Sequence, residues 1–154
     1  MLFDEDIIDY HNLFQTAQQE ICVFTGNNDM EYADEFIKAA RRFTATPGTM
    51  LRIACQCGKD INRCTIIQTI LSSPERQGDV MVYDASHFRG EPYFLLADKA
   101  AYRIEIPALA ETIVDFGDKE ETMRLFDQFQ HIIDRSPLKI HTQSPQPSFG
   151  TVMH

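Results

Sequence analysis

The chain has 154 residues, of which 44% are hydrophobic and 24% charged, and its formal net charge is −9 at pH 7. That length fits one domain with a true core, and the composition is too apolar for a wholly disordered chain. The excess of acids repels phosphate backbones, which disfavours direct nucleic-acid binding. No apolar stretch is long enough for a membrane helix, and the acidic start at Met1–Asp6 lacks the basic region of a secretion signal. We therefore expect a cytoplasmic protein.

The first part of the chain alternates helix-like with strand-like segments. An apolar stripe predicts a helix from Asp4 to about Gln19, and the apolar run 21–24 predicts a strand buried on both faces. Similar patterns predict helices over 30–43 and 60–71 and strands over 50–55 and 80–83. Strands that alternate with helices pair in parallel through right-handed crossovers.

After residue 85 the pattern changes to consecutive strands. The predicted strands 93–97 and 101–106 are separated by three residues, which favours an antiparallel hairpin. Within the second of these strands, apolar and charged residues alternate, as expected when one face is buried. A further strand is predicted over 111–116.

The last regular element predicted is a helix from Gly117 to Asp134. Its apolar stripe consists of Met123, Phe126, Phe129 and Ile133. The proline-containing run that follows shows no sustained periodicity, so we predict a flexible tail over 136–154. Residues 1–135 are predicted to form one α/β domain, a mixed sheet with helices on both faces.

The four cysteines, Cys22, Cys55, Cys57 and Cys64, are interpreted as free packing thiols. A single residue separates Cys55 from Cys57, which directs their thiols to opposite faces of a strand, whereas zinc sites commonly use wider pairs. The turn after residue 25 lacks a complete nucleotide-binding motif. The sequence therefore predicts neither a metal nor a cofactor.

The order of the elements and one segment of the chain resemble one half of a phospholipase D-superfamily protein. The segment runs from Tyr93 to Glu105 and consists of a strand ending in Asp98, a small turn and a second strand. In that family the segment carries His-x-Lys-x-x-x-x-Asp, in which the imidazole is the nucleophile, Lys stabilises phosphoryl charge and Asp supports the site. The resemblance covers roughly residues 5–135 and implies a phospholipase D-like half domain.

The catalytic motif of this family is degenerate here. With Asp98 in its last place, the His position is Glu91 and the Lys position is Tyr93. A carboxylate repels an incoming phosphate, and a phenol carries no positive charge at pH 7. The resemblance therefore implies the fold without the catalytic pair, and Glu91, Tyr93, Asp98 and Arg103 become candidate binding residues.

Three functional hypotheses follow. The first is a non-catalytic module, protein-binding or regulatory, rather than an enzyme, whose partner the sequence does not identify. Because two halves share a site in that family, a lone half is expected to form a homodimer. The second is a phosphodiesterase with a rearranged site, which uses His87, Arg89, Asp98 and Arg103. The third is an acidic inhibitor or decoy that occupies the basic groove of a nucleic-acid-binding machine.

Overall fold

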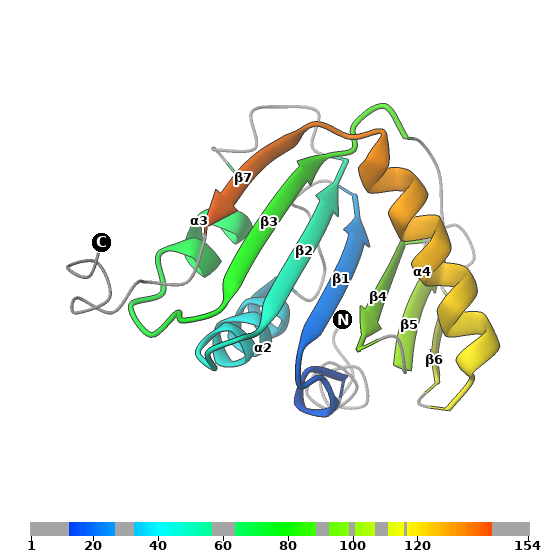
Figure 1. The fold of residues 1–154 in the computed structure, drawn as a ribbon, viewed down its shortest axis with the longest axis horizontal. Coiled ribbons are helices and arrows are strands. Elements are labelled where there is room, and N and C mark those ends of the chain that lie inside the picture. Colours follow the sequence, from blue (N-terminus) through cyan, green and yellow to red (C-terminus); the bar gives the residue numbers. More distant parts are fainter. Residues whose placement is uncertain are drawn as a thin grey trace, which may run out of the picture.

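A seven-stranded mixed sheet with helices on both faces forms the body of the molecule (Figure 1), as the sequence predicts. The computed structural model describes residues 13–26, 33–56, 64–88, 93–98, 101–106, 111–115 and 117–142. The elements are β1 (Glu20–Thr25), α2 (Ala33–Thr44), β2 (Met50–Cys55), α3 (Thr65–Leu71), β3 (Asp79–Asp84), β4 (Tyr93–Ala97), β5 (Ala101–Ile106), β6 (Glu111–Asp115), α4 (Lys119–Asp134) and β7 (Leu138–Thr142). Of the first predicted helix, residues 13–16 are helical, and its earlier part lies outside the described ranges.

The strands lie in the order β6-β5-β4-β1-β2-β3-β7. β1, β2 and β3 pair in parallel, which confirms the pairing predicted from the alternation of helices and strands. β4 runs antiparallel to β1 and forms the predicted hairpin with β5, and β6 extends this half of the sheet. β1 is therefore central, which explains why Ile21–Phe24 is apolar throughout.

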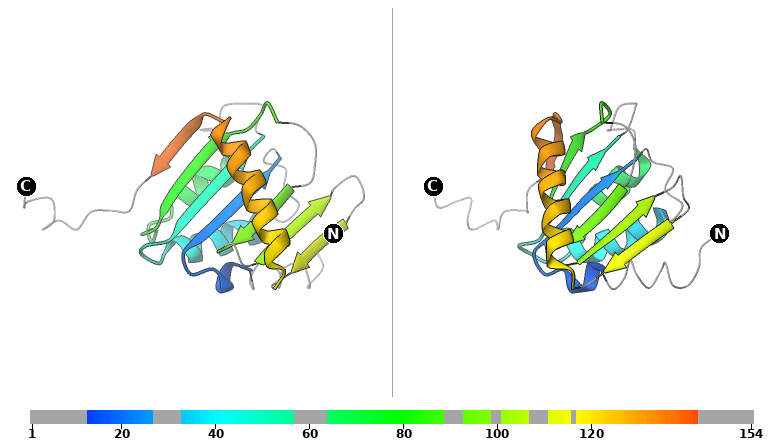
Figure 2. Two further views of the ribbon diagram at one scale, coloured as in Figure 1. Left: turned by 45° about the vertical axis from the view of Figure 1, so that its right-hand side comes forward. Right: turned by 90° about the vertical axis from the view of Figure 1, so that its right-hand side faces the viewer.

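The two faces of the sheet are covered by different helices (Figure 2). On one face, Ile21 and Val23 of β1 contribute to the core beneath α2 and α3. On the other, Cys22 and Phe24 pack in a second cluster beneath α4. No helix in the described part of the chain is long and apolar enough to cross a membrane.

The folded domain extends further toward the C-terminus than predicted. Leu138–Thr142 forms β7, which pairs antiparallel with β3, and Ile140 packs against the core on the α2 side. The prediction of a flexible tail from residue 136 is therefore wrong for this segment, because pairing with β3 satisfies its backbone. The remainder, 143–154, lies outside the described residues.

Helix α4 begins at its predicted position, and Phe129 and Ile133 of its predicted apolar stripe are buried. Asp118 caps it by accepting a hydrogen bond from the Glu121 backbone N–H at 3.0 Å. The prediction that Met123 faces the core is wrong, because its side chain is 48% exposed. The buried positions are Thr122, Leu125, Phe129, Ile132 and Ile133.

Candidate functional site

Tyr93, in the position of the family's lysine, lies at the start of β4 beside the end of β1. Its hydroxyl donates a hydrogen bond to Gln56 Oε1 at 3.0 Å, and Gln56 Nε2 donates to the Phe88 carbonyl at 2.6 Å. The Tyr93 ring meets Phe24 edge-on, with ring centroids 5.8 Å apart. The phenol is thus held by polar and aromatic contacts from three separate segments of the chain.

Gly26 allows Tyr93 to approach the end of β1 closely. A Cβ atom at this position would lie 2.9 Å from the Tyr93 hydroxyl oxygen, closer than ordinary contacts permit. The buried Cys55 thiol donates to the Gly26 carbonyl, with a sulfur–oxygen distance of 3.1 Å. Neither Gly26 nor Gln56 is part of the sequence motif, and the sequence analysis did not identify them as partners of Tyr93.

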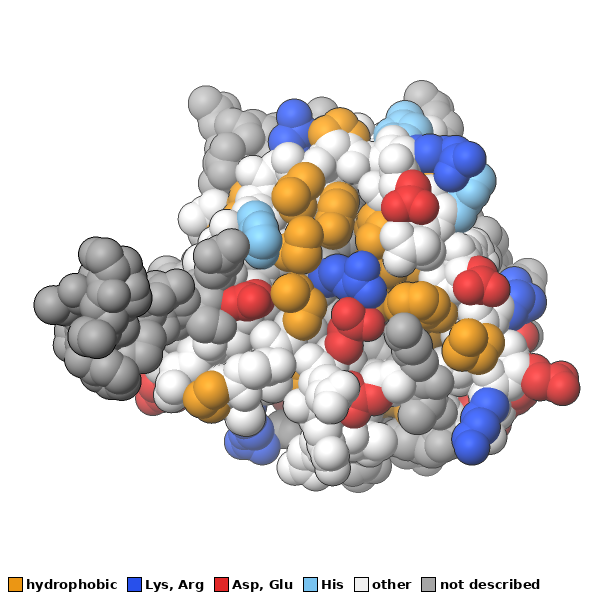
Figure 3. Space-filling view, viewed as in Figure 1, with side chains coloured by type: hydrophobic (Ala, Val, Ile, Leu, Met, Phe, Trp, Pro, Cys, Tyr) orange, Lys and Arg blue, Asp and Glu red, His pale blue; other side chains and the backbone are white. Residues whose placement is uncertain are grey.

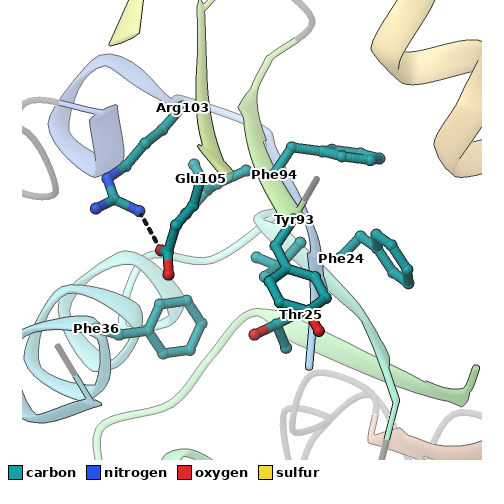
Figure 4. A pocket seen from close by; sticks show the side chains of 9 residues that line it. Phe24, Thr25, Phe36, Tyr93, Phe94, Arg103 and Glu105 are labelled. Atoms are coloured by element: carbon teal, nitrogen blue, oxygen red, sulfur yellow. Dashed lines mark hydrogen bonds and ion pairs between the residues drawn. The ribbon is translucent and has the colours of Figure 1, made fainter. Parts of the chain in front are cut away.

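Arg103 and Glu105 lie next to Tyr93 on the α2 side of the sheet (Figure 4). Arg103 is only 3% exposed, and its guanidinium donates to Glu105 Oε2 at 3.0 Å. Together with Phe36 of α2, these residues line a cavity of about 20 Å³. That volume holds about one water molecule, so this part of the site has no room for a phosphodiester.

Asp98 lies at the opposite end of β4, about 17 Å from Tyr93 at the rise of an extended strand. Its carboxylate accepts hydrogen bonds from the backbone N–H groups of Gln18 at 2.6 Å, Gln19 at 3.0 Å and Glu20 at 2.8 Å. Its backbone is left-handed, with φ of 54°. In this structure Asp98 therefore fixes the chain entering β1 and takes no part in the Tyr93 network.

His87, the imidazole of the alternative phosphodiesterase, is exposed in the loop after β3. Its ring lies tilted against the Phe88 ring, with centroids 4.4 Å apart, and Phe88 packs against the cluster beneath α4. Arg103 faces α2 instead, and Asp98 lies at the far end of β4. These three residues are therefore not brought together. Arg89 and Glu91 lie outside the described residues, and no His, Cys, Asp and Glu cluster within the described ranges could hold a metal ion.

A half-buried ion pair lies on the α4 side of the sheet, where the Arg52 guanidinium of β2 lies 3.0 Å from the Glu20 carboxylate of β1. The guanidinium also donates to the Cys22 sulfur at 3.6 Å and lies 5.5 Å from the centre of the Phe129 ring. Burial, reinforced by the negative charge of Glu20, raises the pKa of Cys22 to about 12 although Arg52 opposes the shift. Cys22 is thus an unreactive thiol at neutral pH.

Hydrophobic side chains gather around one basic and one acidic side chain on this face (Figure 3). Helix α4 packs mainly against β1, β4 and β5, and it leaves Met50 of β2 and Met81 of β3 on the same face of the sheet half-buried. We call this surface the open face. It comprises Met50 and Arg52 of β2, Met81 of β3 and the neighbouring Met123 and Phe126 of α4.

The mixed sheet with helices on both faces is consistent with a phospholipase D-like fold. Among solved structures, the chain is similar to NucT from Helicobacter pylori, a phospholipase D-family nuclease. The two share 12% sequence identity with a TM-score of 0.53, and the match covers 90% of this chain and 96% of NucT. At this identity the likeness concerns the fold alone. No family model and no curated protein matches the sequence.

Proposed function

We propose that this chain is a non-catalytic phospholipase D-like domain that acts by binding protein, first of all a second copy of itself. The observation that supports this most directly is that Tyr93 has an uncharged, hydrogen-bonded side chain. Where the related motif supplies an ammonium group, this chain has a neutral phenol hydrogen-bonded to Gln56, beside a cavity that holds about one water. A transferring phosphoryl group requires positive charge and free donors aimed at its oxygens.

The nearby cation does not replace the missing lysine. Arg103 is almost fully buried and is paired with Glu105 at 3.0 Å. A phosphate that reached Arg103 would also lie beside the negatively charged Glu105 carboxylate. The local charge balance therefore opposes phosphodiester binding at this place.

Protein binding is supported by the open face. Met81 is half-buried and Met123 is 48% exposed, with Arg52 and Glu20 forming a neutral pair between the strands and α4. The centres of protein interfaces are depleted of charge and enriched in methionine, aromatic residues and arginine. The pairing of Arg52 with Glu20 lowers the charge repulsion between two copies of a chain whose net charge is −9.

The test measures mass and turnover on the full-length chain. Multi-angle light scattering should give a dimer for the wild type, and Met81→Glu should shift it to monomer without loss of helical circular dichroism. Gln68→Glu, which places the same charge on the exposed side of α3, is the matched control and should remain dimeric. Bis-p-nitrophenyl phosphate should not be hydrolysed above the buffer rate.

The alternatives give different results. A monomeric wild type at all concentrations would refute self-association, and a dimer retained in Met81→Glu would refute the open face as the contact. Turnover that disappears in His87→Ala would overturn the non-catalytic function and favour the rearranged phosphodiesterase. Binding to a basic nucleic-acid-binding protein that high salt abolishes, without self-association, would favour the acidic decoy.

A further inference from the structure

A second cavity, of about 320 Å³, lies near the amino ends of β1 and β2, away from Tyr93. Its walls come from the segment 13–18, the second half of α2 and the turn that leads into β2. The volume is about ten water-sized volumes and falls at the lower end of the range for small-molecule pockets. It is independent of the function proposed above.

Two alanines on facing segments create this space. Ala17 and Ala39 are both at most 8% exposed, and each contributes only a methyl group to the wall. The hollow opens to solvent beside the exposed residues Gln15, Gln18 and Arg42. The aromatic wall is well fixed, because Phe14 meets Phe36 and Phe43 edge-on at 5.8 and 6.1 Å.

The polar groups around the cavity favour an anion at its mouth. Arg42 is exposed at the rim and is the only charged residue among the described lining residues. It forms no ion pair with another described residue. Thr49, also in the wall, already donates its hydroxyl to the carbonyls of Phe43 and Thr46, so it does not supply a competing donor.

We infer that this cavity binds a small amphipathic anion, namely a free medium-chain carboxylate of about ten carbons. The apolar chain would lie between Ala17 and Ala39, and the carboxylate would meet Arg42 at the surface. Because the walls are apolar, the affinity of the site should grow with the length of the ligand's alkyl chain, by about tenfold for each two methylenes buried. The arginine accounts for the preference of the site for an acid over an alcohol.

Displacement of the fluorescent probe 8-anilinonaphthalene-1-sulfonate from the full chain tests this inference. Decanoate should bind about tenfold more tightly than octanoate and about fivefold more tightly than decanol. Arg42→Gln should reduce decanoate binding to the level of decanol, whereas Arg41→Gln, at an exposed neighbour outside the lining, should change nothing. Ala39→Leu should fill the cavity and abolish binding of both ligands.

Several results would overturn the site. If Arg41→Gln weakens the binding of decanoate as much as Arg42→Gln does, or if decanol binds as tightly as decanoate, the anion contact at Arg42 is refuted. If Ala39→Leu folds and leaves binding unchanged, the ligand lies elsewhere. Should Ala39→Leu fail to fold, Ala17→Val narrows the cavity from the opposite wall and must weaken the binding of both ligands. Binding to phosphatidylglycerol vesicles that survives both cavity substitutions would indicate a surface attraction instead.

Discussion

Asp98 should contribute more to stability than any exposed carboxylate of α4, because its side chain accepts hydrogen bonds from three backbone N–H groups. Both carboxylate oxygens accept hydrogen bonds, at 2.6 to 3.0 Å, from the N–H groups of Gln18, Gln19 and Glu20. Hydrogen bonds to a charged group contribute about 1.5–3 kcal/mol when well buried. Two of these three lie at exposed positions, so solvent reduces each to about 1 kcal/mol or less.

The backbone at Asp98 separates this contribution from conformational strain. Its φ of 54° is left-handed, a region that Asp and Asn tolerate and Gly adopts freely, whereas Ala loses about 1 kcal/mol there. Asp98→Asn keeps one accepting oxygen and should cost about 1 kcal/mol. Asp98→Gly loses the hydrogen bonds alone and should cost about 2 kcal/mol. Asp98→Ala loses the bonds and adds strain, so it should cost about 3 kcal/mol.

Urea unfolding followed by circular dichroism, with linear extrapolation, measures these differences. Asp127→Ala, an exposed aspartate on α4, is the control and should stay within about 0.5 kcal/mol of the wild type. Equal costs for Asp98→Gly and Asp98→Ala would refute the strain argument. A cost below about 0.5 kcal/mol for all three variants would refute the role of the carboxylate in fixing the entry to β1.

Four further substitutions test other parts of the fold by the same urea assay. Asp118→Ala removes the N-cap of α4 and should cost about 1 kcal/mol, with no loss if the cap is unimportant. Phe129→Ala empties a fully buried position and should cost about 3–5 kcal/mol, whereas Met123→Ala should stay within about 0.5 kcal/mol. Because the pKa of Cys22 is about 12 in the folded chain and near 9.0 when unfolded, the unfolded state releases the thiol proton first. Stability should therefore fall as pH rises above about 9, by about 1.4 kcal/mol per unit, and Cys22→Ala should remove that part of the slope.

The sequence predicted the central strands well, because burial leaves a plain signal there. β1 is covered on both faces, which requires a nearly continuous apolar run in the sequence, whereas β2 and β3 bury one face fully and the other in part. β7 was missed since it is an edge strand. Of its residues only Ile140 packs against the core, and Leu138 is 45% exposed, so two apolar side chains between prolines did not indicate a strand.

Met123 was misplaced for a geometric reason. Steps of three residues from Met123 to Phe126 and Phe129 drift around a helix that has 3.6 residues per turn. The buried stripe follows Leu125, Phe129 and Ile132 instead, which places Met123 at its margin. Thr122 is also fully buried there, because its hydroxyl donates to the Asp118 carbonyl and needs no water.

The spacing of the motif identified Tyr93 and Asp98, but it did not indicate that the two residues have different structural roles. Five residues of extended strand place them at opposite ends of β4. The partner of Tyr93, Gln56, follows β2, which lies on the other side of β1 from β4. Their contact depends on the strand order, a property that no local pattern in the sequence contains.

The presence of an aspartate in the motif's last place is therefore weak evidence for phosphodiester chemistry. A chain without the catalytic pair still needs a residue that tolerates a left-handed turn and accepts three N–H groups, and Asp98 meets both requirements. The positions that decide chemistry are those of the imidazole and the ammonium. A lysine at residue 93 alone would bring a second cation beside Arg103 in a cavity of one water. Under the function proposed above, activity at this place would require several coordinated changes.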